Sequence, residues 1–205
     1  MMAKKNIEEQ IIKAAATIFV KKGMDGARMQ EIAAEAGINQ ALLHYYFRSK
    51  EKLFDAVFSE IINNFLKSVF SSISEKDNFK EFLYDFIVSY SQNITEHAEL
   101  TKFILWEFQR GGKLMIKSLR EAQLNGDSAP DFIIRKIEQA KKEGVIRPID
   151  AQNFLLTLLS TVLYPFIARP IFENIFQIPD MTDAAFIDKR NQEVFDLLWS
   201  GIKQN

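Results

Sequence analysis

The sequence predicts an all-α protein, and three observations support that prediction. Apolar residues recur at helical spacing along most of the 205-residue chain, as they do on one face of an amphipathic helix. Turn-forming residues are scarce, with 8 Gly and 5 Pro, whereas 18 Phe supply bulky side chains for a core. No segment alternates apolar and polar residues over a length that predicts a strand. We therefore expect long helices packed around an aromatic core.

The N-terminal part of the chain, residues 1–53, predicts a small three-helix domain followed by the start of a fourth helix. Helix ends are indicated by Gly23 as a C-terminal cap and by Asn39 and Ser49 as N-terminal caps. The expected spans are a first helix from Ile7 to Gly23, a second over residues 29–36, a third over residues 40–46, and a long fourth helix beginning near Ser49.

The remaining residues, 54–205, keep the helical pattern and predict a second, larger helical domain. Glycine-containing and proline-containing breaks separate its segments. The expected helices span residues 78–95, 99–110, 113–122, 130–143, 150–175 and 183–203.

Residues 28–50, RMQEIAAEAGINQALLHYYFRSK, meet the geometric requirements of a helix-turn-helix. Two closely crossing helices need a small residue between them, which Ala33 supplies, and Gly37 can take the positive φ of a tight turn. The apolar residues Ile38, Leu43 and Phe47 are spaced to hold the second helix of the motif in place. Its outward face then begins with Gln40, Ala41, His44 and Tyr45, at the end that reaches base edges in the major groove.

The same segment resembles the TetR family of bacterial helix-turn-helix transcriptional regulators. The matching residues are Ile32-Ala33, Ala36-Gly37-Ile38, Asn39, Leu43-His44-Tyr45-Tyr46-Phe47 and Ser49-Lys50-Glu51-Lys52-Leu53. Two positions depart from the family pattern. Arg28 stands where Thr or Ser commonly opens the second helix, which removes a side-chain cap, and His44 replaces a frequent Tyr.

The resemblance implies a DNA-binding site in residues 1–53. Residues that meet bases or thymine methyl groups would come from the start of the third helix, and the others would contact or shape the backbone interface. The expected set is Gln40, Ala41 and Tyr45 at the bases, Leu42, His44 and Tyr46 along the backbone, Lys50 on a phosphate, Arg28 and Gln30 approaching from the second helix, and the cap Asn39.

For residues 54–205 the resemblance implies effector binding and dimerisation. The broad apolar faces of residues 150–175 and 183–203 predict the homodimer interface, through Leu155, Leu158, Val162, Val194, Leu198 and Ile202. A small apolar or amphipathic effector is expected beside Phe103, Trp106 and Gln109. The expected function is a repressor on a palindromic operator, released by that effector. The alternative is a DNA-bound structural or cell-division factor without a small ligand.

The charge distribution agrees with nucleic-acid binding at the N-terminus. The chain has a formal net charge of −1, yet residues 1–53 carry nine Lys and Arg against six Asp and Glu. The N-terminal part is therefore at +3 and the remainder at −4.

Other function classes find little support. The chain has no Cys and two widely spaced His, 44 and 97, so we expect no disulfide and no metal site. It lacks a glycine-rich phosphate loop and a nucleophile motif, so we expect no enzyme activity, catalytic residue or cofactor. The most apolar segment, residues 154–172, contains Arg169 and two Pro, which argues against a membrane span. A cytoplasmic location is expected.

Overall fold

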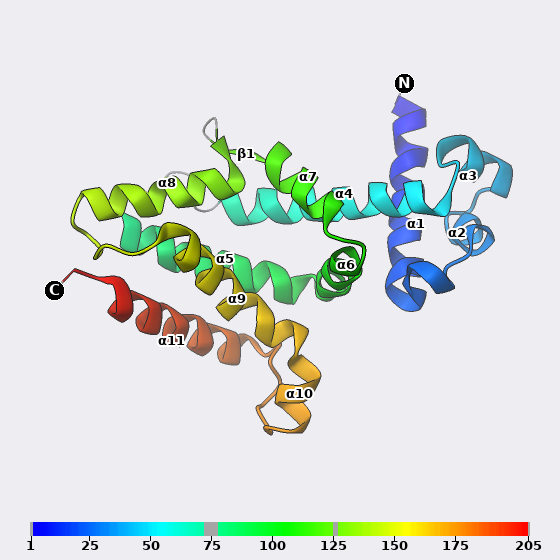
Figure 1. Ribbon diagram of the computed structural model, residues 1–205. Coiled ribbons are helices and arrows are strands. Elements are labelled where there is room, and N and C mark those ends of the chain that lie inside the picture. The colour runs from blue at the N-terminus through cyan, green and yellow to red at the C-terminus, as the bar shows by residue number, and fades with distance from the viewer. Residues whose placement is uncertain (1, 72–77, 125–126, 205) are drawn as a thin grey trace. The chain divides into compact units, whose positions relative to one another are not determined.

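The computed structural model describes residues 2–71, 78–124 and 127–204, which are helical apart from one short ribbon (Figure 1). This confirms the expected all-α class. The helices are α1 Met2–Gly26, α2 Met29–Glu35, α3 Gln40–Tyr46, α4 Lys50–Ser71, α5 Phe79–Glu96, α6 Ala98–Gln109, α7 Lys113–Glu121, α8 Ala129–Lys142, α9 Ala151–Ile167, α10 Arg169–Asn174 and α11 Ala184–Ile202. The strands β1 Gln123–Leu124 and β2 Asp127–Ser128 pair in antiparallel fashion.

The chain divides into two compact units. The first unit comprises residues 1–63 and 102–118, and the second comprises residues 64–101 and 119–205. Helices α4, α6 and α7 each contribute residues to both units. The functional boundary expected after residue 53 stays a prediction.

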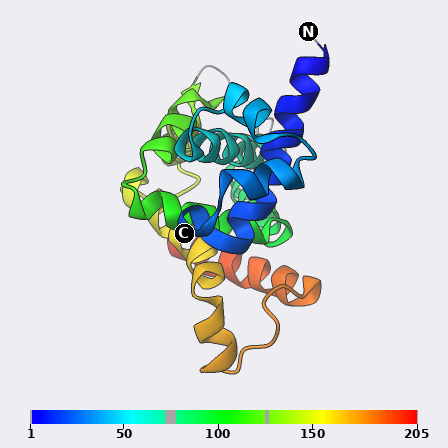
Figure 2. The ribbon, with the colours of Figure 1, turned by 90° about the vertical axis from the view of Figure 1, so that its right-hand side faces the viewer.

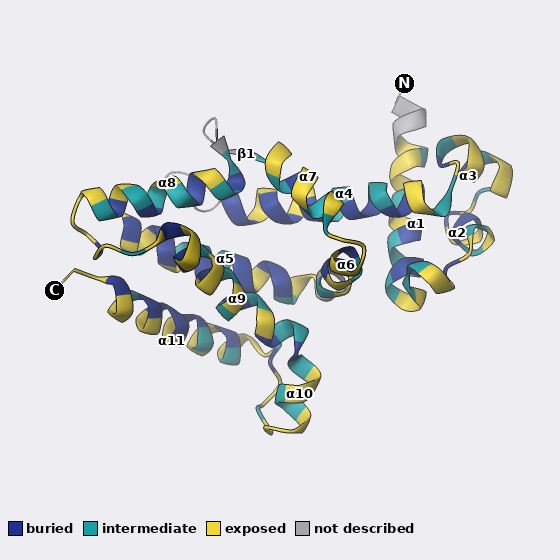
Figure 3. Ribbon diagram, viewed as in Figure 1, coloured by how far each residue is buried: buried dark blue, intermediate teal, exposed yellow. Residues whose placement is uncertain are grey.

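An aromatic cluster forms the centre of the first unit. Phe19 of α1 packs edge-on against Phe54 of α4, with ring centroids 5.3 Å apart. Phe54 also lies 5.5 Å from Phe103 of α6 and 6.2 Å from Trp106. Phe19, Phe54 and Phe103 are fully buried, and Figure 3 shows the buried side of α4 as dark blue. The large phenylalanine content therefore serves, in this unit, to join α1, α4 and α6 in one core.

The second unit is a layered bundle in which α11 packs on α5, α5 on α9, and α9 on α8. Its core is also rich in aromatic contacts: the ring centroid of Phe82 lies 6.3 Å from that of Phe86 and 6.2 Å from that of Phe132 of α8. The end of α11 is tied to the loop before α9: the Arg147 side chain donates to the carbonyl oxygen of Gly201 at 2.6 Å. None of the helices in the described ranges is long and apolar enough to cross a membrane.

The helix expected over residues 150–175 is divided in the structure. α9 ends at Ile167, Ala168 leaves helical geometry with φ −92° and ψ 12°, and α10 begins at Arg169. The break has a direct cause, because Pro170 has no N–H to donate to the carbonyl of Phe166 and its ring would clash with that carbonyl in a continuous helix. Residues 123–124 and 127–128 also differ from a plain break, since they pair as β1 and β2.

Candidate nucleic-acid interface

The helix-turn-helix predicted from the sequence is present in the first unit as α2, a tight turn and α3 (Figure 2). Gly37 has φ +64°, and the N–H of Ile38 donates to the carbonyl of Ala33 at 3.0 Å. Ala33 is buried, which permits the close crossing of α2 and α3. Leu43 and Phe47 are also buried, so the inner side of α3 is fixed to the rest of the unit.

Asn39 begins α3 with a side-chain cap. Its Oδ1 accepts a hydrogen bond from the N–H of Leu42 at 2.8 Å, and its own backbone is extended. This cap satisfies one of the helix's first N–H groups, which have no partner within the helix. The structure therefore gives Asn39 a positioning role at the N-terminus of α3. Its direct contact with DNA stays a prediction.

The outward face of α3 carries the side chains expected to meet DNA. Gln40, Ala41, His44 and Tyr45 are all exposed, and 67% of Tyr45 is accessible to solvent. Tyr46 is half-buried and packs edge-on against Tyr45, with ring centroids 5.5 Å apart. Leu42 is also half-buried. The six residues thus form a polar and aromatic surface over a buried Leu43, and their contacts with DNA stay predictions.

Lys50 at the start of α4 has a structural role that the sequence did not indicate. Its Nζ donates to the carbonyl oxygens of Asp25 and Ala27, both at 3.1 Å. Asp25 lies in the last turn of α1 and Ala27 in the connection to α2, so the ammonium group links the end of α1 and that connection to α4. An ammonium group has three N–H donors, and one remains for the phosphate contact expected from the sequence.

Arg28 and Gln30 both lie on the surface at the start of α2. Arg28 occupies the N-cap position with an extended backbone and makes no side-chain cap hydrogen bond. This agrees with the loss of the cap expected from an Arg at this position. The guanidinium group is therefore exposed and not engaged in capping, as a phosphate contact requires.

Arg48 is a further basic residue beside the outward face of α3, and its contact with DNA is a prediction. It lies two residues after the end of α3, is exposed, and has no ion pair with a residue in the described ranges. Nearby positive charge is reduced at Lys22, whose Nζ lies 2.8 Å from Oε1 of Glu31. The hydrogen bond from Lys22 lowers the pKa of Glu31 and so favours its ionised form. In the sequence, the basic residue between α3 and Lys50 could have indicated Arg48 as a further phosphate contact.

The three residues expected at an effector site differ in how far they are buried. Phe103 is fully buried in the aromatic cluster, with its ring centroid 5.4 Å from that of Trp106. Trp106 is half-buried, and Gln109 is exposed. Phe103 therefore has a packing role in the first unit, and effector binding by these residues stays a prediction.

The six residues expected at the dimer interface lie on α9 and α11 and are mostly buried within their own chain. Five of the six are 1–8% exposed, because they pack α9 and α11 into the core of their own chain. These five are Leu158, Val162, Val194, Leu198 and Ile202. The sixth, Leu155, is half-buried. Their contact with a partner chain stays a prediction. The same helices expose other large apolar residues: Leu156 at 66%, Tyr164 at 58% and Leu197 at 71%.

Comparisons with known proteins agree with this geometry. Residues 11–57 match the profile of the family described as bacterial regulatory proteins, tetR family. The HTH-type transcriptional repressor NicS of Pseudomonas putida is 27% identical over 176 residues, which cover 85% of this chain and 82% of NicS. The biofilm operon icaADBC negative transcriptional regulator IcaR of Staphylococcus aureus is 29% identical over 198 residues, covering 94% of this chain and 97% of IcaR.

A solved structure extends the likeness to nearly the whole fold. AibR, crystallised with isovaleryl coenzyme A and operator DNA, has a TM-score of 0.70 against this chain, at 20% sequence identity. The match covers 94% of this chain and 98% of AibR. The sequence match is centred on α2, the turn and α3, and the structural match includes the helices that follow.

Proposed function

The chain belongs to the TetR family of bacterial regulatory proteins, and on that premise we propose that it is a homodimeric repressor that a small molecule releases from a palindromic operator. As a member of this family it is a DNA-binding transcriptional regulator and not an enzyme. The observation that carries the proposal is the outward face of α3, where polar and aromatic side chains are exposed on a helix whose opposite side is anchored by Leu43.

That face suits the major groove of DNA. Gln40 and His44 offer hydrogen-bonding groups to base edges or phosphates, and Ala41 offers a methyl group to thymine. Lys50 and Arg48 flank the face with positive charge, which favours the phosphate backbone and makes affinity depend on salt. The Asn39 cap holds the N-terminus of the short helix α3, the end that would enter the groove.

A palindromic operator follows from a two-fold symmetric dimer. Leu156, Tyr164 and Leu197 are large apolar residues exposed on α9 and α11, and such surfaces commonly mark protein contacts. A second copy of the chain would cover the same residues on both subunits. Each subunit would then present one α3 to a half-site, with half-sites about 10 base pairs apart or a multiple of that spacing.

Release by a small molecule is supported by what relatives do. AibR was crystallised with both isovaleryl coenzyme A and operator DNA, so a fold of this kind accepts both partners in that protein. In this chain, a cavity of about 10 Å³ lies between α5, α9 and α11 of the second unit. That volume accommodates about one water molecule, so an effector would have to widen the cavity on entry. Such a change in helix packing is a means of altering DNA affinity.

The experiment that tests the proposal is selection of genomic DNA fragments by the purified protein. Recovered fragments should share one inverted repeat near a promoter, and a reporter gene behind that promoter should become more active when the regulator is deleted. Recovery of unrelated sequences would contradict specific recognition, and a fall in reporter activity would contradict repression. Operator binding that no small molecule changes would favour the alternative of a DNA-bound factor without a ligand.

A further inference from the structure

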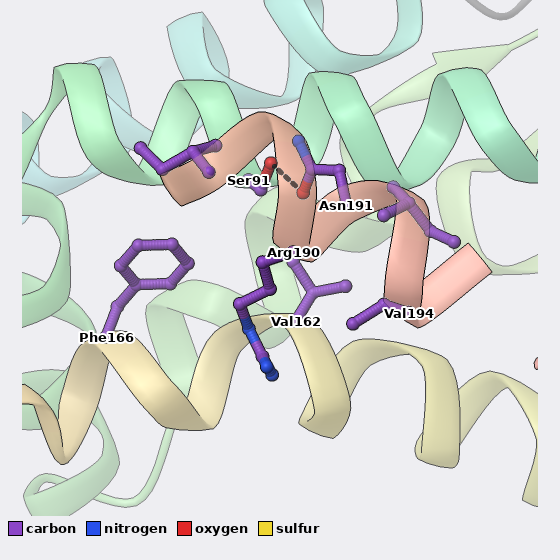
Figure 4. A pocket seen from close by; sticks show the side chains of 8 residues that line it. Ser91, Val162, Phe166, Arg190, Asn191 and Val194 are labelled. Carbon is purple, nitrogen blue, oxygen red and sulfur yellow. Dashed lines mark hydrogen bonds between the residues drawn. The ribbon is translucent and has the colours of Figure 1, made fainter. Parts of the chain in front are cut away.

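The cavity between α5, α9 and α11 has an unusual lining for its size (Figure 4). Eight residues surround about 10 Å³; five are apolar and three are polar. The polar residues are Ser91 of α5 and the neighbours Arg190 and Asn191 of α11. No Asp or Glu is among the eight. The wall therefore combines hydrogen-bond donors and one positive charge with an apolar surface.

Asn191 has a donor without an acceptor. The residue is 4% exposed, and its Oδ1 accepts a hydrogen bond from Oγ of Ser91 at 2.7 Å, the dashed line in Figure 4. Its Nδ2 is buried and has no hydrogen-bond partner in the described part of the chain. Buried donors are almost always paired, because an unpaired N–H has lost its bond to water without replacement. An acceptor in the cavity would remove that cost.

Arg190 spans the space from α11 to α9, and Figure 4 shows its side chain reaching toward α9. Its Nη2 donates to the carbonyl oxygen of Thr161 at 3.1 Å. That carbonyl lacks its usual helical donor, because the residue four positions on is Pro165, which has no N–H. One of five N–H donors is thereby used, and no other hydrogen bond holds the guanidinium among the described residues.

We propose that this site binds a small monocarboxylate with a short apolar chain, and the inference rests on the effector-release function proposed above. The carboxylate would accept a hydrogen bond from Nδ2 of Asn191. Arg190, whose side chain reaches toward α9 in Figure 4, would turn toward the cavity to form the charge-assisted pairing that guanidinium groups favour. The apolar chain would lie among Ile87, Val162 and Phe166. A carboxylate fits this lining better than a cation, since the unpaired amide N–H is a donor, the guanidinium is positive, and no Asp or Glu lines the cavity.

Binding of such a ligand would be coupled to the packing of α9. The cavity admits one water, so even a short acid must displace residues of its lining, of which Val162 and Phe166 belong to α9. Arg190 is also the link between α11 and the Thr161 carbonyl of α9. A carboxylate that draws the guanidinium toward the cavity would therefore loosen α9 from α11.

Titration calorimetry of the full chain with butyrate, hexanoate and octanoate tests this inference. The matched neutral probes are the primary amides of the same acids, which keep the apolar chain and remove the charge. We expect at least one acid to bind about tenfold more tightly than its amide, as the loss of a charge-assisted hydrogen bond predicts. Arg190→Gln should weaken the acid by about tenfold and leave the amide little changed. Lys189→Gln, which removes a charge from the exposed neighbouring residue of α11, should bind as the wild type does.

Two outcomes would overturn the inference: equal affinity of wild type for an acid and its amide, or no binding of any acid by a protein that still binds its operator. The second outcome leaves the proposed DNA-binding function intact, whereas loss of operator recognition with intact hexanoate binding would contradict that function alone. Because the comparison of acid with amide uses the wild-type protein, the test holds even where Arg190→Gln fails to fold.

Discussion

Gly23 of α1 faces the indole ring of Trp106 of α6, and a Cβ placed on Gly23 would lie 3.5 Å from Cζ2 of that ring. α1 kinks here, because Gly23 has φ 71° and ψ 169°, a backbone conformation that residues other than glycine rarely adopt. Trp106 packs in turn on Phe54 and Phe103. The end of α1 and the second half of α6 therefore share one core with the helix-turn-helix unit.

Gly23→Ala should destabilise the first unit through backbone strain. A methyl group has room at 3.5 Å, but the positive φ should cost about 1–3 kcal/mol in the free energy of unfolding. Gly26→Ala is the matched control, since Gly26 has no positive φ and should change stability by less than about 0.5 kcal/mol. Urea unfolding followed by tryptophan fluorescence measures both. Equal stability of the two variants would show that alanine adopts the backbone conformation of Gly23 without strain.

Asn39→Ala should weaken operator binding by loosening the N-terminus of α3. The substitution removes the 2.8 Å hydrogen bond to the N–H of Leu42 and should cost about 1 kcal/mol of stability. Asn39→Asp keeps an acceptor oxygen and should retain that stability. Thermal unfolding and operator titration would be compared for the two variants. Full stability of the Ala variant would argue against the capping role.

Arg48→Ala and Lys50→Ala should separate phosphate contact from structural anchoring. Loss of Arg48 should weaken binding to all DNA and reduce the slope of log affinity against log salt by about 0.9 per lost contact. Loss of Lys50 should do the same and also lower stability on the order of 1 kcal/mol, because the carbonyls of Asp25 and Ala27 lose their donor. Lys142→Ala, at the end of α8, serves as the charge-matched control. An unchanged salt slope for Arg48→Ala would exclude it from the interface.

Leu197→Glu and Leu198→Glu should have different effects although the residues are adjacent. Leu197 is 71% exposed, so a Glu there should produce a folded monomer if α11 forms the dimer interface. Leu198 is 8% exposed, and a buried Glu should unfold or aggregate the protein. Light scattering and circular dichroism distinguish the two results. A Leu197→Glu protein that stays dimeric would place the interface elsewhere.

The local parts of the fold could be predicted from the sequence. The helix-turn-helix depends on residues close in the chain, so the spacing of Ala33, Gly37 and Leu43 was sufficient to predict it. The break at Ala168 also had a local signal in Pro170, which the continuous apolar pattern of residues 150–175 obscured. Helical periodicity indicated most other elements for the same reason.

Contacts between distant segments could not be predicted. Leu156 and Leu158 are both apolar residues of α9, and only the packing of α9 on α5 and α8 decides which one is buried. The anchoring of Lys50 depends on carbonyls more than twenty positions earlier. The polar pair in the cavity joins Ser91 and Asn191, which are 100 positions apart. No periodic pattern encodes contacts of that kind.

The central claim is that the outward face of α3 recognises a specific operator. Fluorescence anisotropy with the selected operator and a scrambled duplex tests it, with wild type compared to the His44→Ala/Tyr45→Ala double variant. Both side chains are exposed, so the variant should keep its fold while its preference for the operator over scrambled DNA disappears. Unchanged operator affinity of a folded double variant would contradict the claim that this face of α3 reads the DNA sequence.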